Sequence, residues 1–319
     1  MEKIQHIRVP TNGINMHVAT IGTGPAILFL HGFPELWYSW RHQLLHLSAL
    51  GYRCIAPDLR GYGDTDVPAS VSEYTGFHIV GDLIGLLDAL GIEQVFLVGH
   101  DWGSIIAWYF CLFRPDRIKA LVNTSVAFTP RFPQLLNPVE NLRAIIGDDY
   151  YVCRFQGPIE HEAQFAGVNT ASLLRSIYTA RDPKPPRIPK NIAYESLFPD
   201  SLCSLPSWLS EEDIDYFATK FKQTGFTGGL NYYRNLKSTW ELMAPWTGQQ
   251  VKVPVKFIVG DLDTAYNLPG VKEYVNNGGF KNDVPLLEEV VIMEGVAHFI
   301  IQEKAQEISQ HIYDFIKKF

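Results

Sequence analysis

The stretch Val95-Phe-Leu-Val-Gly-His-Asp-Trp-Gly-Ser104 decides the fold. It begins as a short, valine-rich apolar run, which is typical of a buried parallel strand. A helical pattern of apolar residues follows as far as Arg114-Pro115, so a tight turn must join the strand to the helix. Gly99 and Gly103 flank that turn and permit a sharp bend. The pattern predicts a nucleophile elbow that displays Asp101 at the carboxyl end of the strand.

Aspartate at the apex of the turn, in place of serine, indicates the kind of reaction. A serine that attacked a saturated carbon would become an ether, which water does not cleave. A carboxylate gives an alkyl ester instead, and water can hydrolyse that ester at the carboxyl carbon. Asp101 therefore predicts displacement at carbon in two covalent steps. The alternative is an ordinary turn in which turn chemistry alone favours Asp.

The composition excludes several classes of protein. The chain has 319 residues, of which 46% are hydrophobic, so it can bury a large core. The net charge of −7 and the lack of a basic block argue against nucleic acid as a partner. No apolar run approaches the ~18 residues of a membrane span, and the start carries no signal-peptide pattern.

The cysteines indicate the compartment. They are Cys54, Cys111, Cys153 and Cys203. Because they form no C-x-x-C pair, we expect reduced, mostly buried thiols in a cytoplasmic protein and no metal site.

Alternating strands and helices predict a parallel α/β sheet that is covered on both faces. We expect strands at 4–9, 14–20, 25–30, 53–57, from 95, and at 119–124, 253–260 and 289–293. Helices are expected at 37–50, at 77–90 and after the elbow. A final helix places Ile308, Ile312, Phe315 and Ile316 on one face.

The alternation stops between about residues 130 and 246, where prolines, aromatic residues and helical stretches prevail. The simplest interpretation is one sheet domain, residues 1–130 and 247–319, interrupted by a helical cap at 131–246. Ligands of such folds bind at the carboxyl ends of the strands. The cap would form the roof of that site.

A nucleophile needs a base, and the base needs a group that orients it. Gly260-Asp-Leu-Asp263 and Gly295-Val-Ala-His298-Phe each follow a predicted strand directly. The order nucleophile, acid, histidine is that of hydrolases with such an elbow. We expect His298 to be the base, although a single histidine among ten is more often a solvated or core residue.

Five motifs form a joint pattern: His31-Gly-Phe-Pro-Glu-Leu-Trp-Tyr-Ser-Trp-Arg-His-Gln43, Asp58-Leu-Arg-Gly-Tyr-Gly-Asp-Thr65, Gly99-His-Asp-Trp-Gly103, Gly260-Asp-Leu-Asp263 and Gly295-Val-Ala-His298-Phe. Together they resemble the soluble epoxide hydrolases of the α/β-hydrolase fold, in particular the plant type without an N-terminal phosphatase domain. The resemblance covers essentially the whole chain. It implies a mostly parallel eight-stranded sheet flanked by helices, with an inserted helical cap. It also implies a small apolar epoxide substrate, such as a fatty-acid or terpenoid epoxide, no cofactor, and a monomer or homodimer.

The resemblance also implies the reacting groups. Asp101 matches the nucleophile and His298 the base that activates water. Asp263 matches the carboxylate partner of His298, whereas the nearby Asp261 does not.

Other matching residues surround those groups. The backbone N–H groups of Phe33 and Trp102 would form the oxyanion hole, with a cis bond between Phe33 and Pro34. Glu35 and His100 match a water or proton relay, and a purely structural role is the alternative. For Ser104, in the first turn of the elbow helix, we expect only a local backbone hydrogen bond.

An opened epoxide leaves an alkoxide, which needs a donor that is protonated at neutral pH, and tyrosine meets this requirement. By resemblance the two donors are Tyr151 and Tyr233 in the cap. Tyr150 and Tyr232 precede them directly, so the choice of donor within each pair of adjacent tyrosines stays open. The alternative is that these tyrosines only pack the cap.

Two other functions share parts of this pattern. A haloalkane dehalogenase also uses an Asp elbow followed by Trp, but it has no use for two cap tyrosines and usually has a polar residue where Phe33 stands. A non-catalytic ligand receptor of the same fold keeps a serine elbow or loses the base. Asp101, Asp263 and His298 together favour the enzyme.

Overall fold

The computed structural model describes residues 3–132, 137–157, 159–198 and 204–319. In these residues eight strands form one sheet in the order β1-β2-β4-β3-β5-β6-β7-β8. The strands are β1 Gln5–Thr11, β2 Ile14–Ile21, β3 Ala26–Leu30, β4 Arg53–Pro57, β5 Val95–His100, β6 Ile118–Thr124, β7 Val255–Gly260 and β8 Leu287–Met293. Strand β2 pairs antiparallel with β1 and β4, and the other pairs are parallel. The predicted mostly parallel eight-stranded sheet is confirmed.

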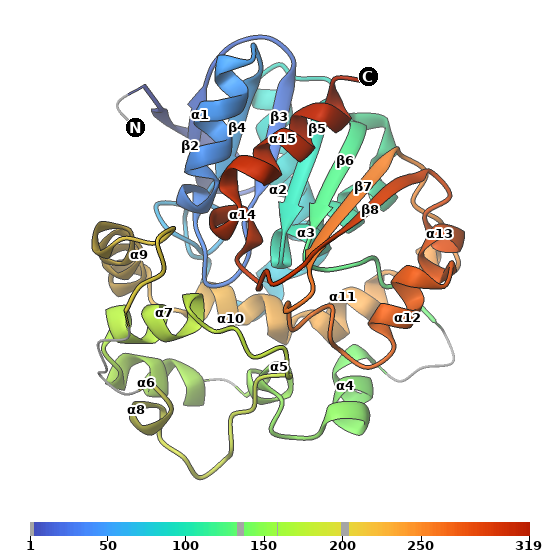
Figure 1. Ribbon diagram of the computed structural model, residues 1–319. Coiled ribbons are helices and arrows are strands. Elements are labelled where there is room, and N and C mark those ends of the chain that lie inside the picture. Colours follow the sequence, from blue (N-terminus) through green and yellow to red (C-terminus); the bar gives the residue numbers. More distant parts are fainter. Residues whose placement is uncertain (1–2, 133–136, 158, 199–203) are drawn as a thin grey trace.

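Helices cover both faces of the sheet (Figure 1). On one face α1 (Arg41–Ala49) packs beside α15 (Ala305–Ile316), and on the other α2 (Gly76–Ala89) packs beside α3 (Trp102–Phe113). The predicted apolar face of α15 is buried in full. Shorter elements are η2 Val71–Tyr74, η3 Pro115–Arg117, α12 Val271–Asn276, α13 Gly279–Asp283 and α14 Ile300–Glu303.

Several predicted boundaries are wrong by one or two residues: β1 ends at Thr11 and not at 9, and β8 begins at Leu287 and not at 289. Two other differences have a clear local reason. Strand β7 begins at Val255, two residues later than expected, because Pro254 has no N–H to donate to a neighbouring strand. The helix expected at 37–50 is a 3₁₀ turn, η1 (Trp37–Trp40), followed by α1. All four side chains of η1 are buried, so this segment lacks the exposed face of an amphipathic α-helix.

Between β6 and β7 the described residues contain helices and no strand, only an isolated bridge between Tyr150 and Arg187. These helices are α4 Pro138–Ile146, α5 Tyr151–Arg154, α6 Glu160–Gly167, α7 Thr170–Tyr178, α8 Tyr194–Leu197, α9 Glu211–Thr224, α10 Thr227–Arg234, α11 Leu236–Leu242 and η4 Ala244–Trp246. They gather along one edge of the sheet, at the bottom of Figure 1.

Two further findings concern the cysteines and the apolarity of the helices. Cys54, Cys111 and Cys153 are free and buried as predicted, whereas Cys203 lies outside the described residues. In the portion of the chain that the structure describes, no helix has the length and apolarity needed to cross a membrane.

Candidate active site

Asp101 lies between β5 and α3 with a φ of 52° and a ψ of −120°, a region that non-glycine residues rarely adopt. The two elbow glycines make this turn fit. A Cβ on Gly103 would lie 2.0 Å from the carbonyl oxygen of Leu30, and one on Gly99 would lie 2.4 Å from Oδ1 of Asn123. The crowding explains the spacing Gly-x-Asp-x-Gly, and the strained turn projects the Asp101 carboxylate away from the sheet.

The loop after β3 brings a backbone donor to Asp101. A Cβ on Gly32 would lie 2.3 Å from the Cβ of Asp101, so only glycine allows this approach. The next residue, Phe33, donates its N–H to Oδ1 of Asp101 over 2.7 Å. The Phe33-Pro34 bond is cis, as predicted. The N–H of Trp102, at the first position of α3, has no carbonyl acceptor within its own helix.

His298 lies between two carboxylates. Its Nδ1 is 3.0 Å from Oδ1 of Asp263, and its Nε2 is 3.5 Å from Oδ2 of Asp101. The backbone N–H of Ala265 also donates to Oδ1 of Asp263, over 2.9 Å. Asp261 instead accepts from the N–H of Val296, so the second aspartate of the motif faces the histidine.

The charges of these groups are coupled. Burial lowers the pKa of His298, but the charge of Asp263 and hydrogen bonds to Asp101 and Asp263 outweigh burial and raise that pKa well above its usual value. Burial raises the pKa of Asp101, yet the hydrogen bond and charge of His298 dominate and the pKa is lowered. The pKa of Asp263 is lowered in the same way. At neutral pH the site therefore holds an imidazolium between two carboxylates.

Ser125 is a neighbour of His298 that the sequence analysis missed. Its hydroxyl lies 3.2 Å from Nδ1 of His298, and a hydrogen bond from Ser125 is among the influences that lower the pKa of Asp263. Ser125 has a φ of 76°, which is rare for serine. Its place directly after β6 was the available signal, because site residues of such sheets follow the strand ends.

Glu35 is fully buried and protonated at neutral pH. Burial, opposed by the N–H of Gly32 and helped by the charge of Asp101, raises its pKa to about 8. Its Oε2 accepts the Gly32 N–H over 2.9 Å and lies 3.8 Å from Nε2 of His100.

The protonation of His100 follows from its partners. Burial, with the charge of His298, lowers the pKa of His100 to about 3, so the ring is neutral. The Thr124 hydroxyl donates to the carbonyl of Gly99, so its oxygen accepts from Nδ1 of His100 over 2.9 Å. Nε2 is then a bare acceptor. Among the described residues, neither this Nε2 nor Oε1 of Glu35 has a hydrogen-bond partner.

Aromatic residues from the core and from the helices between β6 and β7 meet around Asp101. The ring of Tyr233, on α10, lies 5.0 Å from that of Trp102 and 5.6 Å from that of Phe33, between centroids. The ring of Tyr151, on α5, lies 5.7 Å from that of Tyr233. Burial, with contributions that include the charge of Asp101, raises the pKa of both tyrosines well above the usual value.

The neighbouring tyrosines have different surroundings. The hydroxyl of Tyr232 donates to the carbonyl of Arg60 over 2.9 Å in the core. Both rings pack against Trp102, that of Tyr232 at 5.5 Å between centroids, but Tyr233 is the member of this pair that also contacts Phe33. Tyr150 is buried beside Tyr151, with ring centroids 4.8 Å apart, and the two hydroxyls interact. The surroundings therefore distinguish Tyr151 from Tyr150 less clearly than they distinguish Tyr233 from Tyr232.

Ser104 makes a bond of a different kind from the one expected. Its hydroxyl donates to the carbonyl of Thr124, at the end of β6, and not to its own helix. Ser104 therefore ties the elbow helix to the neighbouring strand.

Three comparisons, two of sequence and one of structure, relate this chain to known proteins. Residues 25–305 match the family of the alpha/beta hydrolase fold. Epoxide hydrolase 1 of Siraitia grosvenorii is 66% identical over 319 residues, which cover 100% of both chains. Epoxide hydrolase A of Mycobacterium tuberculosis is 34% identical, over 97% of this chain and 96% of the other. The crystal structure of an epoxide hydrolase from Vigna radiata superposes with a TM-score of 0.97 at 60% identity, over 100% of this chain and 99% of that one.

Proposed function

The chain belongs to the epoxide hydrolases of the α/β-hydrolase fold, and we propose that it hydrolyses its substrate through a covalent ester on Asp101. The observation that carries this mechanism is the unequal environment of the two Asp101 oxygens. Oδ1 accepts the Phe33 N–H, whereas Oδ2 faces His298. Oδ2 is the oxygen that attacks, and Oδ1 becomes the carbonyl oxygen of the ester.

In the first half-reaction Oδ2 of Asp101 forms a bond to an epoxide carbon, and the bond from that carbon to the epoxide oxygen breaks. The lowered pKa of Asp101 supports this role, because the nucleophile must be ionised. The epoxide oxygen leaves as an alkoxide, which takes a proton from Tyr151 or Tyr233. The raised pKa values of both tyrosines support the role of donor, because their hydroxyls keep their protons until an alkoxide forms.

In the second half-reaction His298 acts as the base. Ester formation removes the negative charge of Asp101, one of the charges that raise the pKa of His298. The pKa of His298 then falls, so the imidazolium gives up its proton to solvent, and the tyrosinate left by the first step takes one up. Nε2 of the neutral ring can then accept a proton from water as the water oxygen attacks Cγ of Asp101. Oδ1 carries the negative charge of the tetrahedral intermediate, which the N–H groups of Phe33 and Trp102 stabilise. The Cγ–Oδ2 bond then breaks, the departing oxygen takes the proton from His298, and a vicinal diol is released.

Glu35 and His100 are proposed to hold the attacking water. The protonated Glu35 offers a donor at Oε1 and the neutral His100 offers an acceptor at Nε2. Both atoms are buried and unpartnered within the described residues, which is costly unless water satisfies them. A water bound there would be held in place for attack on the ester.

The substrate class, the division into domains and the assembly are further proposals. We propose that residues 131–246 act as a cap over the core formed by residues 1–130 and 247–319. The aromatic residues that the cap and core bring to Asp101 support an apolar epoxide of the fatty-acid or terpenoid type. The free buried thiols support a cytoplasmic location, and the state of assembly is a monomer or homodimer.

An Asp101→Asn variant tests the proposed nucleophile. With a styrene-oxide-type epoxide we expect no diol, because a neutral amide does not open the ring. A retained fold, measured by circular dichroism, is required for the comparison, and intact-protein mass spectrometry checks that the amide has not hydrolysed back to the acid. Diol formation at the normal rate by the intact amide variant would rule out the ester on this residue. A panel of fatty-acid, terpenoid and styrene-type epoxides, ranked by kcat/KM, tests the substrate class.

A further inference from the structure

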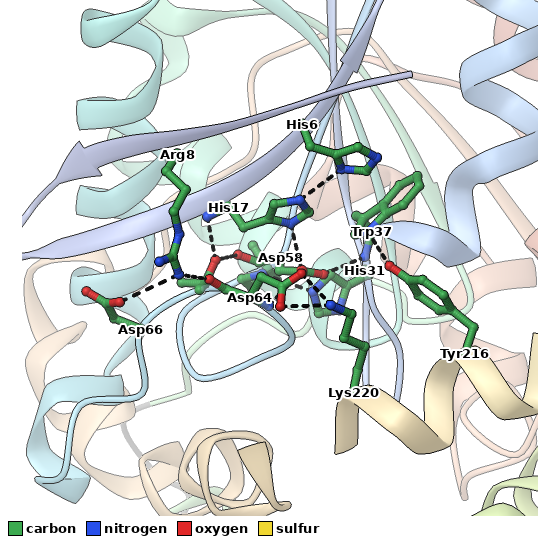
Figure 2. Close-up of polar contacts among 12 residues, drawn as sticks. His6, Arg8, His17, His31, Trp37, Asp58, Asp64, Asp66, Tyr216 and Lys220 are labelled. Carbon is green, nitrogen blue, oxygen red and sulfur yellow. Dashed lines mark hydrogen bonds and ion pairs between the residues drawn. The ribbon is translucent and has the colours of Figure 1, made fainter. Parts of the chain in front are cut away.

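A cavity of about 630 Å³ lies between the β1–β2 hairpin and helix α9, and none of the proposed catalytic residues lines it. Its walls include His6 of β1, His17 of β2, Asp64 of the loop after β4, and Lys220 of α9. Figure 2 shows these groups in close-up. Nothing in the proposed reaction uses them, although two imidazoles and a carboxylate are a combination that binds metals.

The two imidazole rings face each other nitrogen to nitrogen. Nδ1 of His6 lies 2.9 Å from Nε2 of His17, the ring planes differ by 9°, and the ring centroids are 5.2 Å apart. With the nitrogens so close, a centroid separation this large is reached only when the rings lie end to end in nearly one plane. The lone pair of each nitrogen therefore points at the other nitrogen, and one proton lies between them.

Asp58 fixes the proton on the far side of His17. Its Oδ2 lies 2.8 Å from Nδ1 of His17, and the backbone N–H groups of Trp37 and Asp64 donate to the same carboxylate. The Asp58 carboxylate accepts these two N–H groups and Nδ1–H of His17, so that Nε2 of His17 faces Nδ1 of His6. A carboxylate on the second nitrogen is the usual support of a metal-bound histidine.

We propose that Nδ1 of His6 and Nε2 of His17 bind a divalent transition-metal ion such as Zn²⁺, with Asp64 as a third ligand and water completing the shell. The ion replaces the proton that the two nitrogens share, and that proton is released to solvent. Zn–N bonds of about 2.0–2.1 Å in tetrahedral geometry require the nitrogens to separate to about 3.3 Å. The two lone pairs, which point at each other here, must also turn toward a common ion. His6 is exposed on the edge strand β1 and makes this movement by rotating its side chain, whereas His17 is held by Asp58.

Asp64 is the proposed third ligand, and its ion pair with Lys220 makes the proposal testable. His17, Asp58 and Asp64 offer ligand atoms that all lie within 4.8 Å of one another. His6 is not a member of this group and joins it through Nε2 of His17. Lys220 donates to both oxygens of Asp64, over 2.6 and 2.8 Å, and so competes with a metal ion for that carboxylate. Removal of the Lys220 charge should therefore tighten metal binding, whereas a purely structural cluster would merely lose an ion pair.

The experiment is a titration of the untagged full-length protein with Zn²⁺, followed by calorimetry, and with Co²⁺, followed by its visible absorption. We expect one ion per chain and a rise of the melting temperature, because a ligand that binds only the folded state stabilises it. His6→Gln should weaken binding by at least tenfold, and Lys220→Met should strengthen it. Binding should also weaken below pH 6, where protons compete for the imidazoles.

His311→Gln is the matched control, because this half-buried histidine of α15 lies outside the cavity, beside Lys256. The His311→Gln variant should bind Zn²⁺ as tightly as the unaltered chain does. Since His6 is exposed, its substitution should leave the fold intact, which circular dichroism checks. No binding at millimolar Zn²⁺ would overturn the proposal. Binding that His6→Gln leaves unchanged would do so as well, because the ion would then lie elsewhere.

Discussion

The backbone N–H of Phe33 donates a hydrogen bond of 2.7 Å to Oδ1 of Asp101, although 68 residues separate them in the chain. This bond makes the two carboxylate oxygens chemically distinct. Oδ1 is held where negative charge develops during ester hydrolysis, and Oδ2 stays available for attack, 3.5 Å from Nε2 of His298. A single carboxylate can thus serve as nucleophile in one step and as an electrophilic ester in the next.

His298→Gln should separate the two half-reactions. Asp101 should still open the epoxide, but hydrolysis of the ester should slow by roughly 10²–10⁴ because no base activates water. Intact-protein mass spectrometry should detect a mass increase of one substrate. Asp101→Asn is the control and should gain no mass. Turnover of His298→Gln at a normal rate, with no adduct, would show that another group is the base.

Tyr151→Phe and Tyr233→Phe should slow alkylation of Asp101 and leave ester hydrolysis nearly unchanged. Loss of one donor to a developing oxyanion costs roughly 10²–10³ in rate, and less where a second donor compensates. The double variant should be folded and close to inactive. Stopped-flow measurement of the alkylation step tests this expectation.

Tyr150→Phe and Tyr232→Phe are the controls for the tyrosine register. Tyr232→Phe should lose about 1–3 kcal/mol of stability, because the buried carbonyl of Arg60 loses its donor, while alkylation stays normal. If one of these control variants slows alkylation while the variant of the tyrosine that follows it does not, the assignment of that pair is shifted by one residue. If all four variants alkylate at near-full rates, the two tyrosines are not the proton donors.

Glu35 should make stability fall as the pH rises. Its pKa is about 8 in the folded protein against an ordinary 4.5, so between these values the folded state holds one more proton than the unfolded chain. The contribution of Glu35 is complete below about pH 4.5 and is lost as the pH rises to about 8, by about 1.4 kcal/mol per pH unit. Glu35→Gln cannot ionise and should flatten this slope in urea unfolding measured from pH 5 to 9. An unchanged slope would contradict the buried protonated acid.

The sequence predicts those parts of the molecule that have a local signal. The elbow is an example, because a Cβ on Gly99 would lie 2.7 Å from the carbonyl oxygen of Gly103, four residues along, and Asp101 between them has a positive φ. The alternating pattern predicts the parallel sheet, and the places of Asp263 and His298 directly after β7 and β8 predict that both lie near Asp101.

Other features depend on contacts that no pattern encodes. Ser125 reaches His298 through the order of strands in the sheet. The pairing of His6 with His17 depends on the hairpin register, in which His17 lies opposite Arg8 and His6 opposite Ala19. Tyr232 and Tyr233 differ only in the direction of their side chains on α10, which the sequence leaves open.

A single turnover in heavy-oxygen water tests the central claim most directly. With enzyme in excess over epoxide, Oδ2 of Asp101 should be the oxygen added to the diol, so the first-turnover product should carry only ordinary oxygen. After that turnover, mass spectrometry of the peptide that contains Asp101 should find one heavy oxygen in the carboxylate. Heavy oxygen in the first-turnover diol, with an unlabelled peptide, would mean that water attacks the epoxide directly and that the ester does not form.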